Sequence, residues 1–283
     1  MRRLGLVATD LDGTLLDRET YDFAPARPAL DALRERGVPL VLVSSKTRAE
    51  MEPLADAIGA TGPLVVENGG AVVVPREAVA GWPPWRQVDG DRAVLVLGVG
   101  RDRLLEELPE VAAEAGARVR PFAAMSVGEV AALTGLPEAQ AALAMRREYD
   151  EPFVVEDPPG DDRAVDARLD RAARHRGLRV THGGRVHHLT GPADKGQALR
   201  ALLHAWPGGV RGEVVGLGDA PNDLALLLAV DRPIVVPRPD GSVDAALAAR
   251  LPSAERAPGP GPAGWAAAVL AVLAGEPLPR VGA

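Results

Sequence analysis

Short apolar segments alternate with helical segments through the first and last parts of this 283-residue chain, and four of the apolar segments end in a polar residue. Such runs, separated by helical patterns, are typical of buried parallel strands in βαβ units. The expected strands cover residues 4–9, 38–43, 64–66, 213–217 and 234–236, and the expected helices 28–37, 47–58, 195–205, 222–229, 243–251 and 265–274. We therefore predict an α/β fold with a doubly wound parallel sheet.

The pattern changes in the middle of the chain, where strands and helices follow a different spacing. The segment Trp82-Pro83-Pro84-Trp85 is typical of a linker. Strands are expected at 93–97, 153–155, 178–181 and 185–189, and helices at 103–115, 126–133, 137–147 and 163–176. Gly183 and Gly184 separate the last two strands, which indicates a hairpin. We predict a core in two parts, residues 1–80 and 190–283, with an inserted α+β unit over residues 81–189.

Composition limits the class of partner and of metal ligand. The net charge of −7 argues against a nucleic-acid surface, and the absence of cysteine excludes disulfides and thiolate metal sites. No apolar run reaches the roughly 18 residues of a membrane helix, and the first apolar stretch is too short for a secretory signal. We expect a cytoplasmic monomer or homodimer that binds neither nucleic acid nor membrane, and whose metal ligands are oxygen or histidine.

Four expected strands end in Asp10, Ser44, Asn68 and Asp219. Each of these residues alone is equally typical of the start of a loop. In a parallel sheet, however, ligands bind beyond the carboxyl ends of the strands, so the four together predict one site.

The segment Asp10-Leu11-Asp12-Gly13-Thr14 places two carboxylates on one side of an extended chain, because residues i and i+2 point the same way. Asp219 and Asp223 add two more near a neighbouring strand end. Like charges this close require a cation, and a set of carboxylate oxygens suits Mg²⁺.

Two residue types are so rare in this chain that their positions are informative. Among 32 basic residues only Lys46 and Lys195 are lysine, and the only asparagines are Asn68 and Asn222. The background bias is typical of a genome rich in G and C. A lysine that persists against it is expected where a compact ammonium is needed, for example beside a phosphate and a carboxylate.

These residues resemble, in order, the four motifs of the haloacid dehalogenase superfamily, and the resemblance covers the whole chain. The motifs are Asp10-Leu11-Asp12-Gly13-Thr14, Ser44, Lys195 and Gly218-Asp219 with Asn222-Asp223. The long insert between Ser44 and Lys195 resembles the large α+β cap of the sugar-phosphate phosphatases in this superfamily. The resemblance implies a Rossmann-like core with an inserted α+β cap domain.

The resemblance also implies a two-step phosphoryl transfer. Asp10 is then the nucleophile that forms an aspartyl-phosphate, and Asp12 the general acid and base. Ser44 donates a hydrogen bond to the phosphate, and Lys195 neutralises charge. The implied Mg²⁺ ligands are Asp10, Asp12 through its backbone carbonyl, and Asp219, with Asn222 and Asp223 supporting the metal through bound water or through contacts with its ligands.

Within that branch, three segments resemble the mannosyl-3-phosphoglycerate phosphatase family: 125–136, 147–153 and 184–191. The segment Ser44-Ser45-Lys46-Thr47 is similar to that family as well. The implied substrate is a small phosphorylated sugar-glycerate. Its carboxylate is expected to accept paired hydrogen bonds from a group such as an arginine side chain. The candidate substrate-binding residues are Thr14, Ser45, Lys46, Asn68, Gly69, Arg147, Glu148, Arg185 and His187.

Other functions are compatible with the same motifs. A broad-specificity sugar-phosphate phosphatase, which includes glucosyl-3-phosphoglycerate among its substrates, is the main alternative. A phosphomutase of the same fold would return the phosphoryl group to a sugar and release no phosphate. A receiver-type signalling domain is about half this length, and a binding protein without turnover would not need the complete set of motifs.

Overall fold

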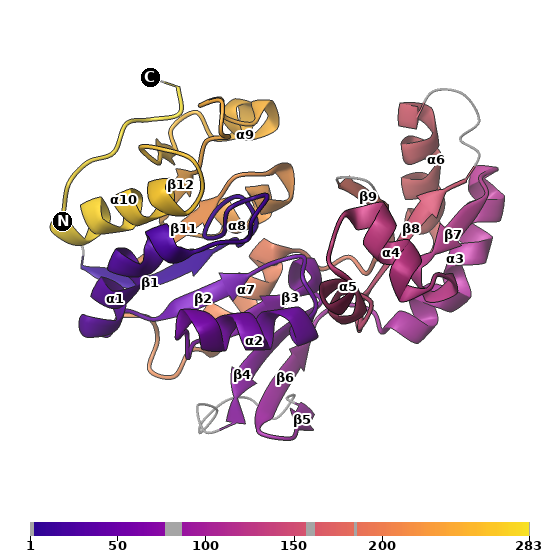
Figure 1. Ribbon diagram of the computed structural model, residues 1–283, viewed down its shortest axis with the longest axis horizontal. Coiled ribbons are helices and arrows are strands. Elements are labelled where there is room, and N and C mark those ends of the chain that lie inside the picture. The colour runs from indigo at the N-terminus through magenta and orange to yellow at the C-terminus, as the bar shows by residue number, and fades with distance from the viewer. Residues whose placement is uncertain (1–2, 77–86, 157–161, 184–185, 283) are drawn as a thin grey trace.

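The computed structural model describes residues 3–76, 87–156, 162–183 and 186–282. The expected linker at 82–85, Gly184 of the expected hairpin and the candidate residue Arg185 lie outside the described residues. Within the described ranges the strands form one sheet of nine strands and one of four. Figure 1 shows the larger sheet with its helices on the left and the smaller sheet, with its own helices, on the right.

The larger sheet has the order β13-β12-β11-β1-β2-β3-β4-β6-β5. Its strands are β1 Leu4–Thr9, β2 Leu40–Val43, β3 Leu64–Val66, β4 Ala71–Pro75, β5 Gln87–Asp89, β6 Arg92–Val96, β11 Glu213–Gly218, β12 Arg232–Val235 and β13 Glu255–Arg256. The strands from β13 to β3 in this order are parallel to their neighbours, whereas β4, β6 and β5 pair antiparallel at one edge. The predicted α/β class is confirmed, with a mixed rather than wholly parallel sheet.

One strand expected in the inserted unit pairs elsewhere. The segment predicted at 93–97 forms β6, which is hydrogen-bonded to β4 in the larger sheet. The physical reason is packing, because Ala93 is buried with Val72 and Val74 in the same apolar cluster. The domain limits 1–80, 81–189 and 190–283 stay a prediction, but the chain leaves the larger sheet only after β6.

Helices cover both faces of the larger sheet, as a doubly wound fold requires. Successive residues of β1 face opposite ways, so Val7 packs with α1, α2 and α10, whereas Leu6 and Ala8 pack with α7 and α8. The helices are α1 Arg27–Glu35, α2 Arg48–Ile58, α7 Lys195–Ala205, α8 Leu224–Leu227, α9 Ala245–Arg250 and α10 Gly261–Ala274. Because both faces are buried, the strands are continuously apolar.

The smaller sheet, here called the cap sheet, is antiparallel with the order β7-β8-β10-β9. Its elements are α3 Arg101–Ala115, β7 Val119–Pro121, α4 Val127–Thr134, α5 Glu138–Ala144, β8 Asp150–Val155, α6 Asp162–His175, β9 Arg179–Gly183 and β10 Val186–Thr190. One face carries α3 and α6 over Phe153 and Leu189, and the other packs α4 and α5 against Val186. The predicted hairpin is confirmed by the pairing of β9 with β10. At the start of α4, Ser126 and Glu129 form a capping box with two reciprocal hydrogen bonds.

The two connections between the sheets meet closely. The outgoing chain passes Gly98 and Val99, and the returning chain passes Gly191. A Cβ at Gly191 would lie 2.9 Å from the backbone nitrogen of Val99, and one at Gly98 would lie 2.9 Å from the Cα of Gly70. Only glycine permits backbones to approach this closely.

Among the described residues, no helix is both long and apolar enough to cross a membrane.

Candidate active site

Four neighbouring parallel strands, β11, β1, β2 and β3, bring their carboxyl ends to one edge of the larger sheet. Asp219, Asp10, Ser44 and Glu67 follow these strands directly and are all buried. Three of them belong to the predicted set, and the structure brings these three together as expected from the strand-end rule.

Lys195 is the first residue of α7, and its side chain is only 1% exposed. The Asp194 side chain caps the helix by accepting the backbone N–H of Gln197, which fixes where the helix begins. The Lys195 Nζ lies 2.6 Å from Asp10 Oδ1 and 2.6 Å from Asp223 Oδ1. Burial by itself lowers the pKa of Lys195, but the two carboxylates outweigh it and raise the pKa, so the ammonium stays charged.

Asp10, Asp219 and Asp223 form a buried group of carboxylates, each with one oxygen within 4.8 Å of the others. Burial and the neighbouring carboxylates raise the pKa of Asp10 well above its usual range, although Lys195 opposes this rise. Burial, with Asp223, also raises the pKa of Asp219 to about 6. A group of oxygen donors whose ionisation is this unfavourable fits a hard divalent cation, which would lower each pKa again.

Asp223 and Thr14 orient this group. Asp223 Oδ2 accepts hydrogen bonds of 3.0 Å from the backbone N–H groups of Asp219 and Ala220. Thr14 Oγ1 donates to Asp219 Oδ1 at 3.3 Å, and the exposed Arg18 forms an ion pair with the other Asp219 oxygen. Thr14, predicted to bind substrate, therefore contacts a carboxylate of the buried group.

Asp12 lies outside that group and pairs with Lys46, the other lysine of the chain. The Lys46 Nζ is 3.0 Å from Asp12 Oδ1 and 4.7 Å from the ring centre of Tyr21. Burial lowers the pKa of Lys46, but Asp12 and Glu50 outweigh this effect, so the pKa is raised. Ser44 Oγ accepts the backbone N–H of Lys46 at 3.1 Å, which holds the segment after β2 in place.

A cavity of about 160 Å³ opens beside Asp12 and Lys46, between the core and the cap. The core contributes Asp12, Tyr21, Ser45, Lys46 and Glu50 to its wall. The cap contributes Phe122, Thr134, Leu136, Arg147, Val186 and His188, among others. This cavity lies between Asp12, the candidate general acid, and polar residues of the cap, which is where a small substrate is expected to bind.

Arg147 joins the cap to the core. Its Nη1 donates to the carbonyl of Ser45 at 2.7 Å and to Asp150 Oδ2 at 3.2 Å. The fully buried Asp150 also binds His188 Nδ1 at 2.8 Å. Arg147 and Ser45, both candidate substrate-binding residues, line the cavity. His188, which was not among the candidates, lines it with them. The Glu148 side chain is exposed and is not part of the cavity wall.

Asn68 and Gly69 shape the edge rather than line the cavity. Glu67–Gly69 is a 3-10 turn in which Glu67 and Asn68 have positive φ. Asn68 accepts a hydrogen bond from the Nδ2 of Asn222 at 3.2 Å, so the two asparagines of the chain are partners. Gly69 has a φ of 101°, and a Cβ there would lie 2.3 Å from the carbonyl oxygen of Asp194. This contact sets α7, and with it Lys195, against the sheet edge.

His187 does not face the cavity. It alternates along β10 with Val186 and His188, so its ring lies on the opposite face of the cap sheet, 2.6 Å from Asp166 Oδ1 of α6. The prediction that His187 contacts the substrate is therefore not supported by its position, and its neighbour His188 faces the cavity instead. No pattern in the sequence distinguishes the two faces, because β10 buries an apolar residue on each of them, Leu189 beside His187 and Val186 beside His188.

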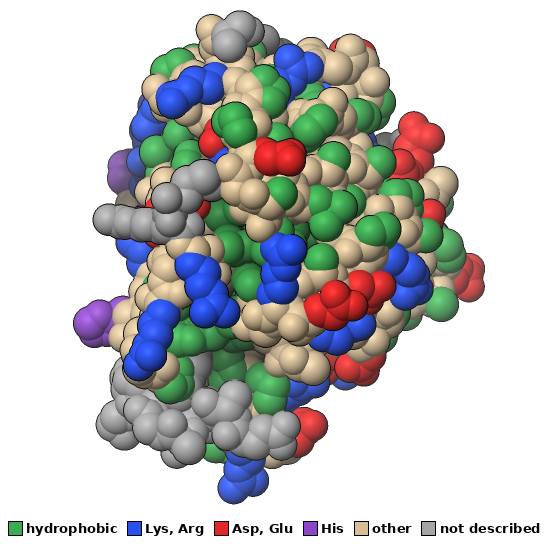
Figure 2. Space-filling view, turned by 90° about the vertical axis from the view of Figure 1, so that its left-hand side faces the viewer, with side chains coloured by type: hydrophobic (Ala, Val, Ile, Leu, Met, Phe, Trp, Pro, Cys, Tyr) green, Lys and Arg blue, Asp and Glu red, His purple; other side chains and the backbone are tan. Residues whose placement is uncertain are grey.

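A larger cavity of about 460 Å³ lies near the amino ends of β2 and β3, lined by residues such as Val38, Pro39, Pro63 and Trp206. None of the candidate site residues is among its lining. Figure 2, which views the side of the molecule away from the cap, shows apolar and charged side chains interspersed on the surface. The larger cavity is remote from the candidate site, because the buried carboxylates and Lys195 are at the opposite ends of the strands.

Comparisons with known proteins place this chain in a family. A family described as haloacid dehalogenase-like hydrolases matches residues 7–80. A glucosyl-3-phosphoglycerate/mannosyl-3-phosphoglycerate phosphatase of Methanococcoides burtonii is 36% identical over 269 residues, covering 95% of this chain and 97% of the relative. A protein of the same name from Persephonella marina is 35% identical over 274 residues, again with 95% and 97% coverage.

The fold has solved counterparts. A crystal structure of a Thermotoga maritima protein superposes with a TM-score of 0.65 at 15% identity, covering 99% of this chain and 100% of that one. Fold, site and family match together define a phosphatase of the haloacid dehalogenase type. The chain belongs to the family of the two glucosyl-3-phosphoglycerate/mannosyl-3-phosphoglycerate phosphatases.

Proposed function

We propose that the protein hydrolyses mannosyl-3-phosphoglycerate to mannosylglycerate and phosphate, with Mg²⁺ and through an aspartyl-phosphate on Asp10. The observation that carries this proposal is the contact of Asp10 with Lys195, inside a buried group of carboxylates at the sheet edge. The shared name of the two relatives supports the choice of substrate.

Asp10 and Asp219 would hold Mg²⁺ through their carboxylates, and Asp12 through its backbone carbonyl, with Asp223 and Asn222 in support. The bound ion would offset the negative charge that the phosphoryl group and the carboxylates bring together. Three oxygen donors within 4.8 Å of one another are compatible with this role.

The protein groups then divide the reaction into two transfers. An Asp10 carboxylate oxygen attacks phosphorus, the bond from phosphorus to the alcohol oxygen breaks, and Asp12 gives that oxygen a proton. Water next attacks the phosphorus of the aspartyl-phosphate, Asp12 takes the proton from the water, and Asp10 is released. Ser44 donates to a phosphate oxygen, and Lys195 keeps positive charge beside Asp10 throughout.

The cavity between core and cap would take the sugar and the glycerate. Lys46, with its ammonium at the wall beside Asp12, offers charge to the glycerate carboxylate, and Ser45 offers hydrogen bonds. Arg147 lies at the same wall, but its contacts with Ser45 and Asp150 support a role in holding the cap in position.

A phosphatase that accepts both the glucosyl and the mannosyl substrate is the second candidate. The name shared by both relatives covers the two compounds, which favours this candidate. The two substrates differ at one hydroxyl, and a site without a dedicated hydrogen-bond partner for it discriminates weakly.

A phosphate-release assay tests the proposal. Mannosyl-3-phosphoglycerate, glucosyl-3-phosphoglycerate, 3-phosphoglycerate, mannose 6-phosphate and mannose 1-phosphate are compared with Mg²⁺ and with a chelator. We expect turnover of the first compound only with the metal. Equal kcat/KM for the first two identifies the dual enzyme, whereas a flat profile across all five contradicts the assignment of the cavity.

A further inference from the structure

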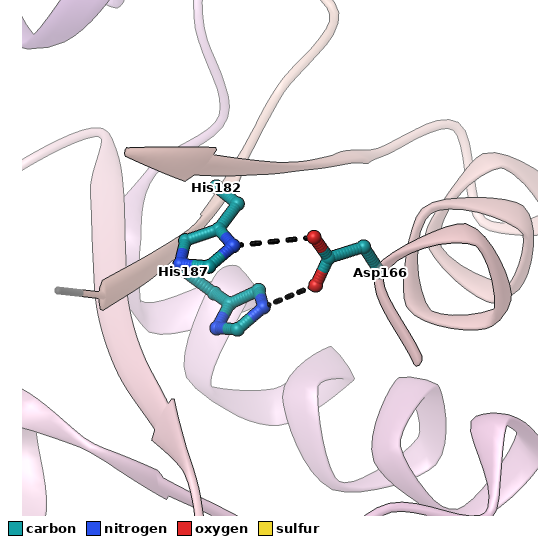
Figure 3. Close-up of side chains that lie close together, drawn as sticks. All are labelled: Asp166, His182 and His187. Carbon is teal, nitrogen blue, oxygen red and sulfur yellow. Dashed lines mark hydrogen bonds and ion pairs between the residues drawn. The ribbon is translucent and has the colours of Figure 1, made fainter. Parts of the chain in front are cut away.

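A second group of ligand-type side chains lies in the cap, away from the phosphatase site. In the antiparallel register of β9 and β10, His182 lies opposite His187, so both rings project from the same face of the cap sheet. Asp166 projects from α6 onto that face. Figure 3 shows the two histidine rings directed at the two oxygens of the Asp166 carboxylate.

The group is compact and partly shielded. His187 Nε2 lies 2.6 Å from Asp166 Oδ1, and His182 Nδ1 lies 3.2 Å from Asp166 Oδ2. The two rings stack with centres 4.2 Å apart, and His187 also stacks on Phe153 at 5.3 Å. His187 is buried, whereas His182 is exposed. The stacking fixes both ring planes, and the open side at His182 gives access from solvent.

The donor set has the chemistry of a transition-metal site. One ligand atom of each residue lies within 4.8 Å of the others, and two imidazoles with one carboxylate are ligands that Zn²⁺ binds at about 2.0–2.2 Å. Imidazole nitrogen suits Zn²⁺ and Co²⁺, whereas Mg²⁺ prefers oxygen. We infer that Asp166, His182 and His187 form a binding site for a divalent transition-metal cation such as Zn²⁺.

This site is separate from the phosphatase centre, since it occupies the face of the cap sheet covered by α3 and α6. Val186 and His188 of the same strand line the cavity on the other face. A bound cation would connect α6 to the β9–β10 hairpin and so hold in place the strand that forms part of the cavity wall.

The competing interpretation needs no metal: each imidazole donates one N–H to the Asp166 carboxylate, and the three residues only stabilise the hairpin. The two interpretations differ in their response to Zn²⁺. The test uses the full chain without a histidine tag, in excess Mg²⁺ so that the core carboxylates are occupied by the ion they prefer.

Zn²⁺ is titrated by calorimetry, and Co²⁺ by the visible absorption that nitrogen-ligated tetrahedral Co²⁺ gives. We expect one equivalent bound, and an increase of the melting temperature on binding. His182→Ala should raise the dissociation constant for Zn²⁺ at least about tenfold and remove the absorption bands of bound Co²⁺. Because the His182 side chain is 42% exposed, this substitution leaves the core of the cap intact, and Mg²⁺-dependent phosphate release reports the fold.

His175→Ala is the matched control. His175 lies on α6, the helix that also carries Asp166, and its Nδ1 lies 2.6 Å from a carboxylate oxygen of Glu114. We expect this variant to bind Zn²⁺ as the wild type does. The inference is overturned if the wild type binds no Zn²⁺ in excess Mg²⁺, or if His182→Ala binds it with unchanged stoichiometry and affinity.

Discussion

The carboxylate of Glu67 accepts a hydrogen bond of 2.8 Å from the backbone N–H of Tyr149, 82 positions further along the chain. It also accepts the backbone N–H of Glu148, at 3.0 Å. Glu67 follows β3 at the edge that carries the site, and Tyr149 directly precedes β8 of the cap sheet. One buried side chain thus ties the position of the cap to the sheet edge.

Replacing Glu67 should change how stability depends on pH. Burial raises the pKa of Glu67 to about 7 from 4.5 in the unfolded chain. The folded protein therefore holds a proton that the unfolded chain has lost, which stabilises the fold at acid pH and ceases to do so as pH rises through about 7. From about pH 5 to about pH 8, the free energy of unfolding should fall about 2 kcal/mol more in the wild type than in Glu67→Gln. Urea denaturation at several pH values measures the free energy of unfolding. The exposed Glu110→Gln variant is the control and should follow the wild type. If the free energy of unfolding depends on pH equally in the wild type and in Glu67→Gln, the prediction is wrong.

Removing Lys195 should lower the free energy of unfolding. Its ammonium compensates two buried carboxylates, so Lys195→Met leaves these charges unpaired and should cost about 3–5 kcal/mol at neutral pH. Added Mg²⁺ should restore part of the stability, because it offsets the same charges. Denaturation with Mg²⁺ and with a chelator measures the effect. A midpoint equal to that of the wild type in chelator would show that the contact contributes nothing.

Gly69→Ala should disturb the site from a distance. The added Cβ would meet the Asp194 backbone at 2.3 Å, and φ at this position is 101°. We expect a loss of several kcal/mol and a lower kcat through displacement of Lys195. Gly116→Ala is the matched control, since φ there is also positive, at 62°, but nothing lies within 4 Å. That variant should lose only about 1 kcal/mol and keep its activity. Equal costs for the two variants would rule out the contact as the cause.

Asp10→Asn should abolish turnover, because an amide oxygen does not form the covalent intermediate. We expect kcat to fall at least about a thousandfold, with circular dichroism unchanged. Rapid acid quenching of the wild type with radiolabelled substrate should trap a phosphorylated protein that the variant lacks. Asp56→Asn, at an exposed position of α2, should behave as the wild type. A near-normal rate for Asp10→Asn would remove Asp10 from the role of nucleophile.

Lys46→Met should weaken substrate binding selectively. A charge-assisted hydrogen bond is worth about 1.5–3 kcal/mol, so KM for mannosyl-3-phosphoglycerate should rise about 10- to 100-fold. The KM for p-nitrophenyl phosphate, which has no glycerate carboxylate, should change much less. Equal increases for both substrates would show that Lys46 acts on the phosphate or on Asp12 instead of on the glycerate.

The positions of Asp10, Ser44 and Asp219 could be predicted because they depend on local patterns. An apolar strand that ends in a polar residue, repeated in neighbouring βα units, places these residues at one edge whatever the details of packing. Lys195 could be predicted from its rarity and from the helix start after Asp194. These features need no knowledge of contacts between distant segments.

The residues that were missed depend on such contacts. Arg18 and Tyr21 reach Asp219 and Lys46 from a loop whose path no periodic pattern determines. The choice between His187 and His188 required knowing which face of β10 turns toward the core, and alternation alone leaves that open. The pairing of β6 with β4 is likewise tertiary, because a short apolar strand fits either sheet.

The close contact of Gly191 with Val99 has a consequence for how this protein family diversifies. Since the chain leaves and re-enters the core at adjoining points, residues 98–191 form an insertion whose two ends already meet. An insertion of this kind can lengthen, shorten or be exchanged without changing the spacing of β1, β2 and β11, whose ends carry the candidate site residues. The cap can therefore vary in sequence and size while the geometry at the edge of the larger sheet is kept.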